Sequence, residues 1–171
     1  YLSQDAYGHT CTRTGATPTG QGGWLFDGTD DYVSCTNLGG VALGTQDFTA
    51  MAWGKTNWAD TSGSTLLIQR KTTGNDDQWA LSESSAANGN TLQLSTYVGS
   101  YDILSNATAI NDNVWHFCAG TRDATNLTVY LDGKQDGQAA TASQNVQSTD
   151  IVNIGCMSPN APTDLRWNGS I

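Results

Sequence analysis

The sequence predicts an all-β protein built as a sandwich of two antiparallel sheets. Apolar residues do not recur at helical spacing over any helix-length stretch, whereas apolar–polar alternation recurs along the chain. Pairs that accept positive φ angles, among them Asn88–Gly89 and Asn168–Gly169, punctuate the alternating runs. Short strands separated by such turns are typical of two packed antiparallel sheets.

Eight runs are predicted to form strands. The alternation is clearest in Thr91–Val98 and Asn126–Leu131, where leucines and valines share one face and therefore point into the core. The second of these runs ends directly before Asp132–Gly133, a pair that predicts a tight hairpin. In chain order the predicted strands are Tyr32–Cys35, Phe48–Lys55, Thr65–Arg70, Gln78–Ser82, Thr91–Val98, Trp115–Arg122, Asn126–Leu131 and Ile151–Cys156.

Size and charge limit the class of protein and of partner. The 171 residues suffice for one domain, residues 1–171, and contain no apolar stretch long enough for a transmembrane helix. The net charge is −9, and the seven lysines and arginines are not clustered. Such a chain repels phosphate groups, so nucleic acid and membrane insertion are not expected, and neutral or cationic partners are favoured.

Four cysteines lie far apart in the sequence, at Cys11, Cys35, Cys118 and Cys156. Without C-x-x-C spacing they do not predict a zinc site. Two disulfides in an oxidising compartment, or buried thiols in a reducing one, both fit this pattern. We expect at least one disulfide.

Seven phrases of the sequence resemble, in order and spacing, the laminin-G-like jelly rolls of the concanavalin A-like lectin and glucanase superfamily. The phrases are "YGHTCTRTGAT", "LFDGTDDYVSC", "DFTAMAWGK", "VWHFCAGTRD", "LTVYLDGK", "VNIGC" and "RWNGSI". The resemblance implies an antiparallel jelly-roll sandwich, but functions in this superfamily are mixed. It also implies that the first and last strands are missing, as in a fragment of a longer polypeptide or a domain completed by another chain.

The carboxylates do not form a pattern typical of catalysis. Hydrolysis of a glycoside needs two carboxyl groups about 5 to 10 Å apart, and fifteen of the sixteen acids are aspartates with Glu83 alone. The resemblance implies paired acids in a Glu-rich strand motif, which the chain lacks. His9 lies in a predicted turn, and His116 is interpreted as a sheet residue rather than a base. The sequence therefore predicts a protein that is not an enzyme.

The aspartates of "LFDGTDDYVSC" have two interpretations. The family resemblance implies a structural calcium between the first loop and this segment, with Asp5, Asp30 and Asp31 as ligands, and Ca²⁺ takes such oxygen ligands. The alternative is that Asp27–Gly28 makes a turn and Asp30 caps it by accepting backbone N–H bonds.

Aromatic residues in polar surroundings are the candidate ligand-binding residues, because sugar rings pack on aromatic faces. The resemblance implies buried roles for Trp53 and Trp115, and Trp24 and Trp167 are also expected to pack. The candidates are therefore Trp58, Tyr101, Trp79 and Tyr97. If Trp58 and Tyr101 project from the same side, they form one platform for a pyranose, with polar groups from Asn57, Asp60, Asp102 and Gln78 nearby.

These observations predict a non-catalytic glycan-binding or adhesion module of a larger extracellular, cell-surface or virion protein. Carbohydrate or neighbouring protein subunits are the expected partners. Two alternatives remain at this point. One is a structural assembly domain of a fibre, adhesin or phage capsid decoration that binds no sugar, and the other is a carbohydrate-active enzyme.

Overall fold

The computed structural model describes residues 10–20, 22–36, 42–59, 61–70, 77–141, 144–147, 151–158 and 165–171. Within these ranges the chain forms fourteen strands and one short 3-10 helix, Ala86–Asn88. All paired strands run antiparallel, so the predicted all-β class is confirmed. No helix in the described ranges is long and apolar enough to span a membrane.

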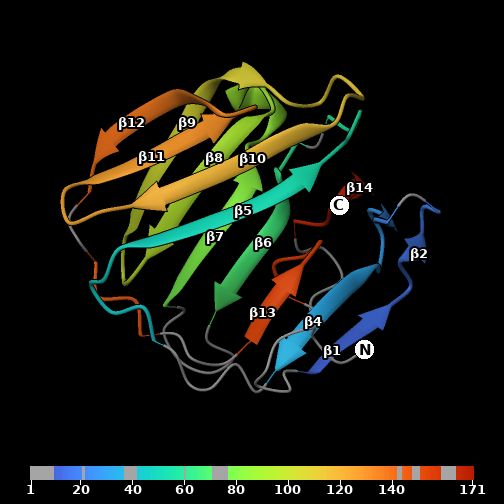
Figure 1. Ribbon diagram of the computed structural model, residues 1–171, viewed down its shortest axis with the longest axis horizontal. Helices are drawn as coiled ribbons and strands as arrows, with labels where there is room; N and C mark the ends of the chain where they lie inside the picture. Colours follow the sequence, from blue (N-terminus) through green and yellow to red (C-terminus); the bar gives the residue numbers. More distant parts are fainter. Residues whose placement is uncertain are drawn as a thin grey trace.

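The larger sheet has seven strands in the order β1-β4-β13-β6-β7-β8-β9 (Figure 1). Its middle strands are almost wholly buried on both faces, and the smaller sheet covers one of these faces. Its strands are β1 (Thr10–Thr14), β4 (Tyr32–Thr36), β6 (Ser64–Arg70), β7 (Gln78–Glu83), β8 (Thr91–Tyr97), β9 (Tyr101–Ala109) and β13 (Ile151–Ile154).

The smaller sheet has four strands in the order β12-β11-β10-β5 and lies across β6 to β9 (Figure 1). Its strands are β5 (Phe48–Gly54), β10 (His116–Arg122), β11 (Asn126–Leu131) and β12 (Lys134–Ala140). A third sheet, which the sequence did not predict, has the order β14-β3-β2. It contains β2 (Thr17–Pro18), β3 (Trp24–Asp27) and β14 (Asn168–Ser170).

The core lies between the two main sheets. Leu81 and Leu94 of the larger sheet and Leu127 and Val129 of the smaller one are at most 1% exposed. The sheets approach closely at Gly120, where an added Cβ would lie 2.9 Å from a methyl carbon of Leu94. The leucines and valines that alternate along the sequence therefore face each other across the sandwich.

All eight predicted strands are confirmed, with ends that differ by at most two residues. Asp132 and Gly133 have φ angles of 52° and 79° and join β11 to β12, as the hairpin signal predicted. Asn168–Gly169, in contrast, is part of β14 rather than a turn. Gly169 is required there because an added Cβ would lie 2.1 Å from the Lys55 carbonyl oxygen.

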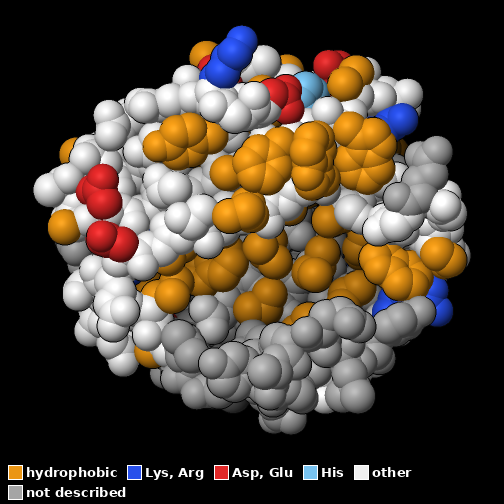
Figure 2. Space-filling view, viewed as in Figure 1, with side chains coloured by type: hydrophobic (Ala, Val, Ile, Leu, Met, Phe, Trp, Pro, Cys, Tyr) orange, Lys and Arg blue, Asp and Glu red, His pale blue; other side chains and the backbone are white. Residues whose placement is uncertain are grey.

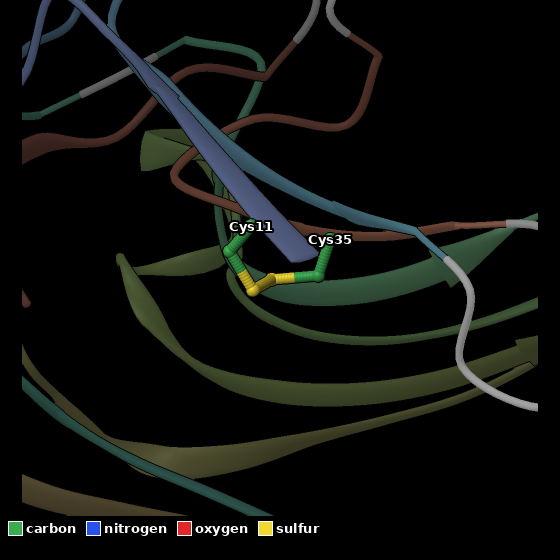
Figure 3. Close-up of a disulfide and its surroundings, with 2 residues drawn as sticks. All are labelled: Cys11 and Cys35. Carbon is green, nitrogen blue, oxygen red and sulfur yellow. A yellow bond between two sulfur atoms is a disulfide. The ribbon is translucent and has the colours of Figure 1, made fainter. Parts of the chain in front are cut away.

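The predicted disulfide joins Cys11 to Cys35, which face each other across β1 and β4 with Cα atoms 4.0 Å apart (Figure 3). The other two cysteines, Cys118 and Cys156, are buried and form no disulfide. Burial raises the pKa of the Cys118 thiol to about 12, so this side chain remains protonated at neutral pH. The two-disulfide interpretation is therefore wrong, and one bond links the first strand to the sheet.

Candidate binding site

Tyr97 and Tyr101 lie at the two ends of the turn between β8 and β9. They occupy paired positions on the two antiparallel strands, and their ring centroids are 4.5 Å apart. Tyr101 is 52% exposed. Because cross-strand neighbours on one face are held in contact by the backbone ladder, the two rings form one aromatic surface at the edge of the larger sheet.

A groove lies next to this aromatic pair, on the outer face of the larger sheet. Trp79 and Leu81 point into the core, so the alternation of β7 directs Gln78, Ala80 and Ser82 outward. The cavity has a volume of about 140 Å³. We call it the Tyr101 groove, and its lining residues are Thr65, Gln78, Ala80, Ser82, Gln93, Ser95, Tyr101, Ile103, Met157 and Leu165.

The polar part of the Tyr101 groove offers amide and hydroxyl groups. Gln78 is 2% exposed, and its side-chain carbonyl accepts no hydrogen bond from the residues that the structure describes. Ser82 and Ser95 are likewise almost fully buried beside it. A buried carbonyl without a donor costs free energy, and this oxygen has less than 1 Å² of exposed surface, so a ligand reaches it only if the Gln78 side chain moves.

Trp79, although predicted as a binding residue, lies in the core. It is 8% exposed and packs against Phe48 with ring centroids 5.5 Å apart. Its indole N–H donates a hydrogen bond of 2.8 Å to Gln69 Oε1. Its side chain therefore faces away from the groove.

Trp58 is 47% exposed but lies far from Tyr101. Its backbone N–H donates to Thr56 Oγ1, and the Thr56 carbonyl accepts from the N–H of Asn113, which follows the end of β9. Tyr101 begins β9, and a nine-residue strand spans about 25 Å. The two side chains therefore lie at opposite ends of the sandwich, and the shared platform that the sequence suggested does not form.

The polar neighbours proposed from the sequence separate in the same way. Gln78 lines the Tyr101 groove, whereas Asp102 follows Tyr101 on the opposite face of β9 and accepts a 2.7 Å hydrogen bond from Thr141 Oγ1. Asn57 accompanies Trp58 in the sequence. Asp60 lies outside the described residues. Of the three that the structure describes, Gln78 is the one that lines the groove.

The aspartates of the β3–β4 loop converge. Carboxylate oxygens of Asp27, Asp30 and Asp31 lie within 4.8 Å of one another. Asp27 Oδ1 accepts backbone N–H bonds from Thr29 and Asp30, and Asp31 Oδ2 accepts one from Asp27. The predicted cap at Asp30 is therefore wrong, since Asp27 and Asp31 accept these bonds.

The same loop is electrostatically suited to a cation. Burial raises the pKa of Asp31, and the neighbouring charges of Asp27 and Asp30 raise it further. The hydrogen bond from the Asp27 backbone N–H lowers this pKa but does not cancel the rise. The carboxylates open onto a recess that Gly15 also lines, and an added Cβ at Gly15 would collide with Asp31 Oδ1. The oxygens not engaged by the backbone fit the donor set of Ca²⁺. Asp5, the third predicted ligand, lies outside the described residues.

His116 forms a second cluster, which the sequence did not predict. It lies in β10, as expected of a sheet residue, and its Nδ1 is 2.8 Å from Asp132 Oδ2 and its Nε2 is 3.1 Å from Asp112 Oδ1. Carboxylate oxygens only accept hydrogen bonds. Both ring nitrogens must therefore donate, and the geometry calls for the imidazolium form. No sequence motif links positions 112, 116 and 132, because the β10–β11 hairpin brings them together.

The charge of this cluster makes stability depend on pH. Burial lowers the pKa of His116, but the hydrogen bonds and charges of Asp132 and Asp112 outweigh it and raise the pKa above its usual value. The hydrogen bond from the Val114 amide lowers the pKa of Asp112. The stabilisation that protonated His116 gives the folded state is thus fully present below about pH 6.5 and is lost as the pH rises through the raised pKa. The stabilisation from the ionised aspartates is lost in acid, below about pH 4.

We expect His116→Gln to destabilise the protein by about 1 kcal/mol near pH 5.5, since hydrogen bonds to charged groups are lost. The difference from wild type should shrink as pH rises past the pKa of His116. Chemical denaturation across this pH range measures it. Asp132→Asn is the matched variant, because asparagine tolerates the positive φ at this position. A difference that stays constant with pH would contradict the charged cluster.

The outer face of the smaller sheet carries a row of exposed apolar side chains, visible across the molecule in Figure 2. Trp53 is 56% and Trp115 is 37% exposed, so the prediction that both are buried is wrong. Trp53 packs against Phe117 on the paired strand, with ring centroids 5.5 Å apart. Strand alternation explains this result, because Ala52 and Cys118 point inward and direct their neighbours outward. Trp167 is fully buried, as predicted, and Trp24 is half-buried against Arg13.

Residues 27–171 match the family model described as the concanavalin A-like lectin/glucanases superfamily, of laminin-G type. The chain belongs to this superfamily. The match covers most of both main sheets, so the resemblance of the seven sequence phrases is confirmed. A search of curated proteins finds no match to the chain.

Solved structures of the superfamily type share the fold at low sequence identity. The binding domain of Paraclostridial Mosquitocidal Protein 1 has a TM-score of 0.72 at 10% identity, covering 95% of this chain and 43% of that one. Mouse laminin α1 domains LG4-5 have a TM-score of 0.70 at 11% identity, covering 94% and 43%. The sialyllactose-bound CBM40 of the Ruminococcus gnavus IT-sialidase has a TM-score of 0.59 at 17% identity, covering 74% and 72%. The chain thus spans less than half the length of the first two structures.

Proposed function

We propose that this domain is a non-catalytic glycan-binding module and that it holds a sugar in the Tyr101 groove. The observation that carries the proposal is the Tyr97–Tyr101 pair, whose rings are in contact at a tilt of 49°, beside a groove lined by amides and hydroxyls. Aromatic rings pack against the apolar C–H face of a pyranose, while amides and hydroxyls meet its hydroxyl groups. The groove combines both kinds of contact within one small cavity.

The similar structures support a binding role over a catalytic one. The Paraclostridial structure is named a binding domain, and the CBM40 of the Ruminococcus gnavus IT-sialidase is bound to α2,3-sialyllactose. The acids that the structure describes give no catalytic pair at the groove, because none lines it and Glu83, the single glutamate, points to the opposite face of β7 and accepts a 2.6 Å hydrogen bond from Ser64. The disulfide supports an extracellular or cell-surface location.

Replacing Tyr101 by alanine is expected to lower glycan affinity about fivefold to tenfold, since one stacking contact contributes about 1 kcal/mol and the groove loses a wall. Monovalent affinity should be micromolar to millimolar, so the measurement is a glycan array with multivalent protein. Trp58→Ala is the matched control, because Trp58 is equally exposed but remote. Loss of binding in Trp58→Ala with retention in Tyr101→Ala would place the site elsewhere.

A structural assembly domain is the second candidate function, and the exposed apolar row favours it. Met51 and Trp53 are each more than half exposed on β5, the end strand of the smaller sheet. A recess of about 340 Å³ next to them is lined by Gly22, Gly23, Trp53, Trp115 and Ile171. Large exposed apolar surfaces often mark protein interfaces. Sedimentation of the wild type and Trp53→Ser tests this role, which predicts self-association that the variant loses.

We also propose that the β3–β4 loop holds a structural calcium ion. Adding Ca²⁺ to chelator-treated protein should raise the melting temperature by several degrees, because a ligand bound by the native state alone stabilises it. Asp31→Asn should abolish this rise. Asp123→Asn, in a loop where the carboxylate only accepts local hydrogen bonds, should keep it. An unchanged transition in wild type at millimolar Ca²⁺ would leave Asp27 and Asp31 as turn-stabilising residues.

A further inference from the structure

We infer that the Tyr101 groove selects an uncharged sugar residue and discriminates against sialylated, sulfated or uronic acid residues. This inference rests on the proposed glycan-binding function. It is independent of the superfamily, since it depends on which side chains this particular chain places around the cavity. Three features of the groove carry it.

The first feature is the lining itself, which contains no acidic or basic side chain among the described residues. Five lining residues are uncharged and polar, and five are apolar or aromatic. The polar ones are Thr65, Gln78, Ser82, Gln93 and Ser95. Transferring a carboxylate or sulfate from water into such a cavity, without a cation to pair with it, is strongly unfavourable. A neutral hydroxyl loses much less hydration.

The second feature is the kind of polar group that the lining supplies. Thr65, Ser82 and Ser95 carry hydroxyl groups, and the half-buried Gln93 carries an amide. Hydroxyl and amide groups can both donate and accept hydrogen bonds, as a sugar hydroxyl does. A carboxylate or sulfate oxygen only accepts, and none of these groups offers it a charged donor. The chemistry of the lining therefore favours hydroxyl groups.

The third feature is that the nearest arginines do not reach the cavity. Arg70 is the partner of Gln78 across β6 and β7, but it does not line the groove and already has an interaction of its own. Arg166 follows Leu165 and lies over the ring of Tyr32, 5.9 Å from its centroid. With a net charge of −9, the long-range field also repels anionic glycans.

The volume of about 140 Å³ gives the groove room for about one sugar residue. Clefts that hold drug-sized ligands measure about 300 to 1,000 Å³. Ile103 and Met157 give the cavity the apolar contacts that a pyranose face requires.

The test is an array of matched glycans in which each neutral structure is paired with its sialylated and sulfated forms, probed with multivalent protein. We expect the neutral member to bind at least about tenfold more strongly, which is the effect of one unpaired buried group. Tyr101→Ala should remove this binding. Because the described lining residues contribute no cation, binding of the neutral member should change little with salt.

Gln93→Lys provides the positive control for the mechanism. Gln93 is half-buried in the lining, so a lysine there brings a cation to the groove at a site that tolerates a longer side chain. The variant should narrow or reverse the preference for the neutral glycan. The wild type could instead bind anionic glycans as strongly as neutral ones, or more strongly, and lose this binding in Tyr101→Ala. That result would overturn the selectivity for neutral glycans and leave the proposed function intact. An array with no binding to any glycan would overturn both.

Discussion

Replacing Arg122 by alanine is expected to destabilise the domain by about 3 kcal/mol or more, the largest effect of any single side chain considered for this protein. Arg122 is 1% exposed in β10, and its guanidinium donates to the carbonyls of Gly44, Gln46 and Gln144 at 2.9, 2.6 and 2.9 Å. It also lies 5.0 Å from the ring centroid of Phe48. Truncation removes three hydrogen bonds and the contact with Phe48, and it takes away the donor to the Gln46 carbonyl. The Gly44 and Gln144 carbonyls still accept from the Val146 N–H.

The effect of Arg122→Ala should extend to the binding site. Arg122 holds the Gln144 carbonyl, and the Gln144 side-chain amide donates a 2.9 Å hydrogen bond to the Ser100 carbonyl, in the turn between Tyr97 and Tyr101. Urea denaturation measures the stability, and glycan affinity of the folded fraction measures the coupling. Arg122→Lys should lie between wild type and alanine, because one ammonium cannot reach all three carbonyls. A loss of less than about 1 kcal/mol in Arg122→Ala would contradict this role.

Removing the Cys11–Cys35 disulfide is expected to cost about 3 kcal/mol. The bond closes a loop with a sequence separation of 24, and cross-links of this span mainly restrict the unfolded chain. For a protein of this size the melting temperature should fall by roughly 6 to 12 °C in the double serine variant or in wild type with reductant. Reductant should have no further effect on the variant, which is the internal control.

Glycan binding by the disulfide variant should be unchanged below its melting temperature. Cys11 lies in β1, at the opposite end of the larger sheet from β8 and β9, which carry Tyr97 and Tyr101. The two properties are therefore separable. A stability loss under about 0.5 kcal/mol would mean that β1 is held by its ladder with β4 without help from the bond.

All the strands are antiparallel and paired, but the strands that the sequence predicted are more deeply buried than those that it did not predict. Asn126–Leu131 places Leu127 and Val129 in the core, so apolar and polar residues alternate along its sequence. Lys134–Ala140 is an end strand with mostly exposed side chains, and its sequence carries no such alternation. Pairing with β11 decides that it is a strand. Patterns of hydrophobicity detect burial, and end strands are recognised only from their neighbours.

Trp53 and Tyr101 show the same limit for the site. The period of two correctly separates Trp53 from Ala52, but a period alone cannot tell which face of a strand is covered. The family resemblance implied a buried Trp53, and the structure places it on the surface. Tyr101 was proposed for its polar surroundings, and it does lie at a groove. Its predicted companion Trp58 does not, because the length of β9 separates two residues that are alike in sequence context.

By itself the sequence determined the all-β class, the eight strands with apolar alternation, the Asp132–Gly133 hairpin and the superfamily, because these depend on local propensity and on short-range order of residue types. The tertiary structure alone decided which carboxylates meet His116, which cysteines pair, and that Gln78 and Tyr101 share a groove. Each of these contacts joins residues on different strands. Register and sheet order, rather than any local pattern, set the distances between them.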